Sequence, residues 1–324
     1  MKSLNELYSK TVDFITKNDN FLVIAHDRPD GDTIGSALAV YLFLKKLKKN
    51  VTIVCKSPVP QVFSFLKASD EIKTDFLFGD FHNIILIDNG DLKRTGFDER
   101  LKEYHRLGKP ILNIDHHPQN DIWKLAKINL VIQAVSSTAE IVFSLLSKMN
   151  YSKIDSHIAT SILSGVFTDT GGFQHATTSA ETLKLAATLM SLGGKLKEIS
   201  KNLSGQKSYL LLKLWGVVLK RLRINQKYQI VTSIITQSDI NDIGCSEEDL
   251  AGVVNLINSV SDAKAAMLLY ETKDGSIKGS LRTEEDDIDV SVLASLLGGG
   301  GHKKAAGFSL EGKLVRKDGK IDIE

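Results

Sequence analysis

Residues 21–36 read FLVIAHDRPDGDTIGS, an apolar pentapeptide followed at once by histidine and aspartate. The apolar run predicts a buried strand, and the segment from Thr33 to Lys49 predicts a helix after it. His26, Asp30 and Asp32 lie in the turn between the two elements. A proline and a glycine in this turn fix one backbone angle and free another, so the three side chains can converge from a loop. This stretch therefore predicts a ligand-bearing junction between a strand and a helix.

The same pattern recurs three more times, and each time we expect the polar residues to stand at the end of a strand. Apolar runs at 84–87 and 111–114 precede two of these segments. The polar residues concerned are Asp88, Asp115, His116, His117 and Asp169. Strand ends share one edge of an open α/β sheet, and buried carboxylates there need partners or a cation. The four segments together predict a site that binds two divalent ions.

The donor types indicate which ions fit. Carboxylate oxygens and imidazoles without thiols favour Mn²⁺ or Mg²⁺, and imidazole leaves Zn²⁺ and Co²⁺ as alternatives. Two such ions can clamp a phosphoryl group and activate water. The chemistry that we expect is phosphoester hydrolysis.

Strand and helix patterns alternate through the first half of the chain, which predicts an α/β fold with a doubly wound, mostly parallel sheet. A helix over residues 206–223 is expected to join this domain to a smaller α+β domain. We expect a catalytic domain over 1–195, linker helices over 196–223 and a second domain over 224–324. The active site is expected in the cleft between the two domains.

Bulk properties narrow the class of protein. The 324 residues are 25% charged and 42% hydrophobic, as in ordinary globular proteins, and the net charge of +2 argues against a broad surface that coats nucleic acid. Two cysteines far apart favour a reducing compartment. The N-terminal residues resemble neither a signal peptide nor a membrane span, so we expect a cytoplasmic protein without a membrane association.

Residues 298–307 read GGGGHKKAAG and form a second motif. Consecutive glycines let backbone amides approach phosphate oxygens, although a flexible loop or a helix cap is the alternative for the glycines alone. An arginine shortly before them suits bidentate recognition of phosphate. The predicted substrate-binding residues are Arg282, Gly299, Gly300, Gly301 and His302.

Together these motifs resemble the DHH phosphoesterase superfamily over residues 15–312, and the tail resembles the first type of DHH-associated C-terminal domain. The layout looks most like the NrnA-type group of oligoribonucleases and pAp phosphatases. The resemblance implies one ion on His26 and Asp30, and a second ion on the remaining ligands, with one bridging carboxylate. Those remaining residues are Asp32, His116 and Asp169 for the second ion, and Asp88 as the bridge.

The same resemblance implies roles around the substrate. His117 would face the scissile phosphate as a ligand or proton donor, and Asp115 would orient the neighbouring imidazole. Arg282 and His302 would grip the nucleotide. Many NrnA-like proteins have an arginine or another polar group in the segment 171–176, where this chain has GGFQHA, which leaves the phosphate and base contacts open.

The expected function is Mn²⁺-dependent hydrolysis of short single-stranded RNA to 5′-mononucleotides, or of pAp to AMP and phosphate. A phosphodiesterase for pApA or cyclic di-AMP is the alternative. A non-catalytic nucleotide-binding or RNA-binding module is disfavoured because every expected ligand position is occupied. No obligate protein partner is evident, and the sequence leaves open whether the chain forms a homodimer.

Overall fold

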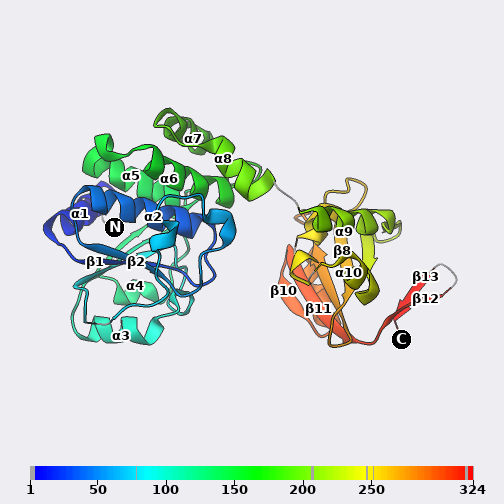
Figure 1. Ribbon diagram of the computed structural model, residues 1–324. Coiled ribbons are helices and arrows are strands. Elements are labelled where there is room, and N and C mark those ends of the chain that lie inside the picture. The colour runs from blue at the N-terminus through cyan, green and yellow to red at the C-terminus, as the bar shows by residue number, and fades with distance from the viewer. Residues whose placement is uncertain are drawn as a thin grey trace. The chain divides into compact units, whose positions relative to one another are not determined.

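The chain folds into two compact units, Met1–Gln206 and Lys207–Glu324 (Figure 1). Each unit has its own sheet and its own hydrophobic clusters. The computed structural model describes residues 4–77, 79–205, 208–245, 247–250, 252–317 and 320–323. Within these ranges, no helix has both the length and the apolar character needed to cross a membrane.

The first unit is built on a five-stranded parallel sheet with the strand order β2-β1-β3-β4-β5. Its strands are β1 Phe21–Ala25, β2 Val51–Cys55, β3 Asn83–Ile87, β4 Ile111–Asp115 and β5 Ile128–Val131. The predicted doubly wound α/β fold is therefore confirmed. Every residue of β1, β3 and β4 is buried, because helices cover both faces of the sheet.

The helices divide between the two faces. Alternate residues of the strands pack against α1, α2, α5 and α6 on one face and against α3 and α4 on the other (Figure 1). The helices of this unit are α1 Leu4–Lys17, α2 Gly31–Lys46, α3 Asp98–Arg106, α4 Ile122–Leu125, α5 Thr138–Asn150, α6 Ser156–Asp169, α7 Ala180–Ser191 and α8 Leu196–Ser200.

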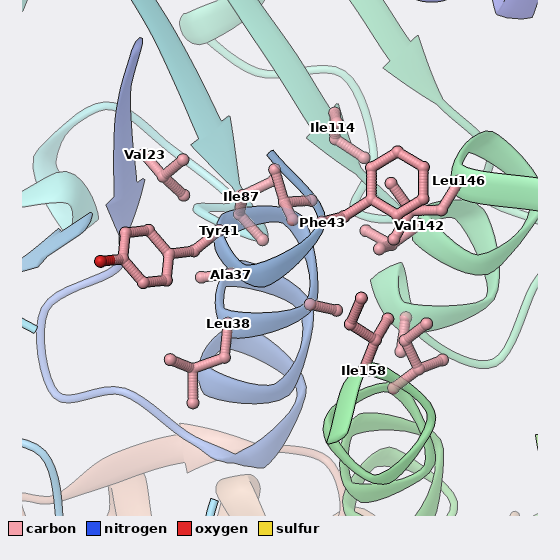
Figure 2. Close-up of a cluster of buried hydrophobic side chains, with 14 of the residues drawn as sticks. Val23, Ala37, Leu38, Tyr41, Phe43, Ile87, Ile114, Val142, Leu146 and Ile158 are labelled. Carbon is pink, nitrogen blue, oxygen red and sulfur yellow. The ribbon is translucent and has the colours of Figure 1, made fainter. Parts of the chain in front are cut away.

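The larger core cluster fixes the position of α2 over the sheet. Figure 2 shows Val23, Ile87 and Ile114 from three strands, together with Phe43 of α2 and Val142 of α5. Because α2 also packs against α6, most of its residues are buried on every side. Its N-terminus, which begins directly after the first polar turn, is consequently held rigidly at the end of β1.

One expectation about the fold is wrong. Asp169 does not follow a strand but is the last residue of α6. The apolar residues before it recur at helical spacing, and Asp155 caps the helix by accepting hydrogen bonds from the amides of His157 and Ile158. A helix C-terminus therefore brings the fourth polar segment to the sheet edge.

The second unit has a six-stranded mixed sheet with the order β10-β11-β9-β8-β7-β6. Its strands are β6 Arg223–Asn225, β7 Ile230–Ile235, β8 Ala265–Glu271, β9 Ser276–Arg282, β10 Gly300–His302 and β11 Ala305–Glu311, with a separate hairpin of β12 Leu314–Lys317 and β13 Lys320–Ile323. Its helices are α9 Tyr209–Lys220, α10 Gln237–Ile243, α11 Val253–Ile257 and α12 Val290–Leu296. The helix predicted over 206–223 is thus present as the shorter α9, which packs within this unit.

The contact between α2 and α6 depends on small residues. A Cβ atom on Gly35 would lie 2.3 Å from the carbonyl oxygen of Ser161 and 3.0 Å from the amide nitrogen of Gly165. Both neighbours are backbone atoms of a buried helix, so they cannot rotate away.

We predict that Gly35→Ala lowers the free energy of unfolding of the first unit by about 1–3 kcal/mol, because the added methyl group forces the two helices apart. Gly216→Ala in exposed α9, where no atom lies within 4 Å of the new Cβ, is the control and should be neutral or stabilising by up to about 1 kcal/mol. Urea denaturation followed by circular dichroism measures both. Equal effects of the two substitutions would contradict this account of the packing.

Candidate metal centre

The polar segments meet at the carboxyl ends of three adjacent strands. His26 follows β1, Asp88 follows β3, and Asp115 is the last residue of β4. Because β1, β3 and β4 are neighbours in the sheet, these ends share one edge. Asp30 is the N-cap of α2, and its side chain accepts a hydrogen bond from the Thr33 amide.

The structure brings all six predicted metal ligands together. Together with His117, they form three donor groups among the described residues, each with its atoms within 4.8 Å of one another. The groups are His26, Asp30 and Asp88; Asp32, His116 and Asp169; and Asp88, His116 and His117. The donors are carboxylate oxygens and imidazole nitrogens, a set that fits hard or borderline divalent ions. The residues therefore fit a metal ion.

Two threonine hydroxyls hold the carboxylate of Asp88. Thr33 donates to Oδ2 at 2.7 Å, and Thr138 donates to Oδ1 at 2.8 Å. Asp88 is only 2% exposed and adopts a φ of 58°, a left-handed backbone angle that aspartate, like asparagine, adopts more often than most residues other than glycine. Sequence reasoning missed both threonines, although Thr33 stands at the start of a predicted helix next to the first polar segment; Thr138 begins α5, for which no local pattern pointed to Asp88.

The carboxylate of Asp32 joins α2 to the N-terminus of α5. It accepts hydrogen bonds from the amides of Thr138 at 2.6 Å and Ala139 at 2.9 Å, and from the hydroxyl of Ser36 at 3.1 Å. The positive end of a helix dipole favours an anion at this position. Gly165 of α6 lies against the same carboxylate, where a Cβ would be 2.7 Å from Oδ1.

His117 and Asp115 form a hydrogen-bonded pair beside the donor groups. Asp115 Oδ1 accepts from the His117 ring Nδ1 at 2.7 Å and from the His117 amide at 2.9 Å, while Oδ2 accepts from the Gly90 amide. Burial opposes ionisation of Asp115, but the hydrogen bonds from His117 outweigh it and lower the pKa. The hydrogen bond to Asp115 in turn raises the pKa of His117. The imidazole to which Asp115 is hydrogen-bonded is therefore that of His117.

Burial, together with the crowding of carboxylates, raises the pKa values of three aspartates. Burial, followed by the charges of Asp30 and Asp115, raises the pKa of Asp88 to about 6. Burial, with the charges of Asp88 and Asp30, raises the pKa of Asp169 to about 7. Burial and the neighbouring carboxylates also raise the pKa of Asp32 well above its usual value. Ionised carboxylates in this cluster repel one another, so a bound cation would stabilise the site.

The loop after Asp169 is tightly built. Gly171, Gly172 and Phe173 all have a positive φ, and the ring of His175 packs against Gly171. The Nδ1 atom of His175 lies 3.0 Å from the Asp169 carbonyl oxygen. Of the two residues that distinguish this segment, Gln174 and His175, the histidine thus contacts the backbone of a candidate ligand.

In the second unit, Arg282 and His302 lie in one row across three strands. Ala305 of β11 pairs with Arg282 on one side and with His302 on the other, so the three side chains point to the same face. Gly300 and Gly301 belong to β10 and not to a flexible loop. The Gly299 amide donates to the Ala294 carbonyl at the end of α12, which is a helix-cap contact.

The fold and the site define a phosphoesterase hydrolase of the DHH family. Residues 20–166 match the model of the DHH family, N-terminal domain, and residues 226–320 match the DHHA1 domain. The chain is 30% identical to the bifunctional oligoribonuclease and PAP phosphatase NrnA of Thermus thermophilus over 296 residues, which cover 90% of this chain and 84% of the relative. The chain therefore belongs to the DHH family.

Two further relatives extend the likeness over both units. The bifunctional oligoribonuclease and PAP phosphatase NrnA of Bacillus subtilis is 26% identical over 300 residues, which cover 91% of each chain. A crystal structure of an exopolyphosphatase-related protein from Bacteroides fragilis is 26% identical, with a TM-score of 0.82 over 96% of this chain and 92% of that one. The predicted family resemblance is confirmed.

The raised pKa values predict how pH affects the metal-free protein. Because Asp32, Asp88 and Asp169 have raised pKa values when folded, the folded protein binds more protons than the unfolded chain between about pH 4 and pH 7. The free energy of unfolding should consequently fall as the pH rises through this window. Divalent ions bind the ionised carboxylates and should restore the stability at the upper end.

Thermal denaturation with a chelator at pH 5, 6 and 7.5, and with excess Mn²⁺ at pH 7.5, tests this expectation. The control is Asp169→Asn, which removes one titrating carboxylate and should flatten the decline. If the midpoint of the chelated protein rises with pH, with the same slope in the variant, the cluster does not govern the pH dependence.

Proposed function

We propose that this phosphoesterase hydrolyses short oligoribonucleotides to 5′-mononucleotides and pAp to AMP and phosphate, with Mn²⁺ as its cofactor. The observation that supports the proposal most is the pair of donor groups at the sheet edge, His26 with Asp30 and Asp88, and Asp32 with His116 and Asp169. The Thermus thermophilus relative bears the name of both activities and aligns with 90% of the chain.

In this proposal each donor group would hold one ion. His26 and Asp30 would hold the first, Asp32, His116 and Asp169 would hold the second, and Asp88 would be shared by the two. Two bound ions supply Lewis acidity to the phosphoryl oxygens and lower the pKa of a water molecule. Thr33 and Thr138 orient the bridging carboxylate through their hydroxyls, as partners of metal ligands commonly do.

His117 supplies the proton chemistry. Its Nδ1–H donates to Asp115, which leaves Nε2 to face the substrate. The raised pKa of His117 increases the share of the imidazolium, which can donate a hydrogen bond or a proton to an anionic phosphate oxygen or to the leaving group. Asp115 acts as a positioning residue for this imidazole.

Arg282 and His302 recognise the nucleotide. The row that they share with Ala305 is followed by a row of Gly300, Gly307 and Ser280, so small residues form a flat surface between the two polar side chains. A base or a sugar can approach this surface closely, while the arginine and the histidine contact phosphate or base. The Gly299 amide is already bonded to Ala294, so its contribution would be steric.

An assay panel tests the proposed substrates. The protein is incubated with pAp, a five-nucleotide RNA, pApA and cyclic di-AMP in Mn²⁺, with parallel reactions in Mg²⁺ and Co²⁺. We expect the fastest turnover with pAp or the short RNA in Mn²⁺. If cyclic di-AMP or pApA is hydrolysed at least tenfold faster than the other two, the alternative phosphodiesterase function replaces this proposal.

We further predict that Arg282→Ala and His302→Ala each lower kcat/KM for pAp and short RNA roughly 5- to 150-fold. This fall corresponds to about 1–3 kcal/mol of binding free energy, because a charged or polar contact to the nucleotide is lost. Hydrolysis of bis-(p-nitrophenyl) phosphate should change much less, since this ester offers no nucleotide. Lys278→Ala, an exposed cation on the same strand as Arg282, is the control. Equal losses on both kinds of substrate would show that the two residues do not act in nucleotide recognition.

A further inference from the structure

Arg94 is a cation beside the candidate metal ligands, and the function proposed above gives it no role. It lies in the 3₁₀ turn Lys93–Thr95 after β3, and its side chain is half-buried. Its Nη2 atom lies 3.1 Å from Nε2 of His26, one of the candidate metal ligands. The guanidinium therefore reaches into the donor cluster itself.

The backbone of Arg94 is fixed on both sides. Its amide donates to the carboxylate of Asp91 at 2.8 Å, and its carbonyl accepts from the amide of Asp27 at 2.6 Å. The turn after β1 and the turn after β3 thus hold the residue between them. Such fixation lowers the entropy cost of holding a long side chain in a defined place.

Gly90 provides the space that the guanidinium occupies. A Cβ atom at Gly90 would lie 2.8 Å from Nη1 of Arg94 and 3.6 Å from the ring of His117. The guanidinium is therefore close to Gly90, next to the imidazole of His117 as well as that of His26. Both imidazoles and the guanidinium line one side of the cluster.

The hydrogen bond between Arg94 and His26 is incompatible with metal coordination by the same nitrogen. Nδ1 of His26 lies 2.8 Å from the Asp27 carbonyl oxygen, which can only accept, so Nδ1 carries the proton and Nε2 has a single lone pair. The same nitrogen lies 3.5 Å from Oδ2 of Asp30, another candidate ligand, and in the neutral imidazole its lone pair serves either Arg94 or an ion. When it serves an ion, the guanidinium needs another acceptor within reach.

The charge of the cluster indicates what that acceptor is. The four carboxylates proposed as ligands carry four negative charges, which two divalent ions would offset without a surplus for an incoming phosphate. A guanidinium beside the ions supplies positive charge in a fork that matches two phosphate oxygens. We propose that Arg94 is a catalytic residue that binds the non-bridging oxygens of the scissile phosphate. The inference rests on the phosphoesterase function proposed above.

The test compares Arg94→Gln, Arg94→Lys and the neighbouring exposed Lys93→Gln as a charge-matched control. We expect Arg94→Gln to lower kcat/KM about 100- to 1000-fold for both pAp and bis-(p-nitrophenyl) phosphate, because both present the scissile phosphate. Arg94→Lys should recover part of the loss, since it keeps the charge but not the fork. Lys93→Gln should stay close to wild type.

Calorimetric titrations provide readouts apart from turnover. Binding of Mn²⁺ should be unchanged or tighter in Arg94→Gln, because a competitor for His26 is removed, whereas binding of inorganic phosphate to the Mn²⁺-loaded protein should weaken at least tenfold. A fall in Mn²⁺ affinity that matches the fall in activity would overturn the proposal and make Arg94 a support for His26.

A loss confined to pAp would also overturn it, since Arg94 would then recognise the nucleotide. If the wild-type protein hydrolyses neither pAp nor RNA but its hydrolysis of the generic ester still depends on Arg94, the substrate assignment fails and the role of Arg94 stands. If Arg94→Gln has a lowered melting temperature, the same kinetic and binding measurements on Arg94→Lys, with a wild-type melting temperature, decide between the outcomes.

Discussion

Repulsion among buried carboxylates is the constraint on which the first unit depends. Asp32 and Asp88 are almost wholly inaccessible to water, yet the donor groups to which they belong share His116, and Asp169 joins the group of Asp32. Such charges are tolerated only where positive potential and hydrogen-bond donors surround them. The N-termini of α2 and α5 provide both, through the hydroxyl of Thr33 and the amide and hydroxyl of Thr138. The helices therefore stabilise the negative charge of the site as well as the fold.

The two units contribute different kinds of chemistry. The first unit gathers acidic and imidazole donors at a rigid sheet edge, where their negative charge favours a bound cation. The second unit has an arginine and a histidine on one face of its sheet, next to alanine, glycine and serine residues that leave room for an anionic ligand. The metal binding proposed for the first unit and the nucleotide recognition proposed for the second would consequently be encoded in separate sheets, and each could vary without rebuilding the other.

Sequence patterns predicted what depends on local periodicity. The runs before His26 and Asp88 were short, apolar and bounded by polar turns, so the strands and the polar residues at their ends could be located. The sequence places Asp169 wrongly at a strand end because a short apolar run followed by a polar residue has the same pattern in a strand and in a buried helix. The roles assigned to single ligands stay predictions, whereas their convergence is now observed.

What the sequence could not reveal depends on tertiary contacts. Two sets of hydrogen bonds join residues that are 50 or more positions apart. Thr33 and Thr138 donate to Asp88, and Arg94 contacts His26. Likewise, the glycines of β10 form a strand because Gly301 lies against the backbone of Ala306, which no local pattern shows.

Gly165 links the packing of the helices to the chemistry of the centre. A methyl group there would meet the side chain of Ala139 as well as the carboxylate of Asp32. The interior of the helical layer and the candidate metal centre thus share the same few atoms. Sequence drift at this buried position is therefore limited by the carboxylate of Asp32, and a change that looks like ordinary core variation would first displace a candidate metal ligand.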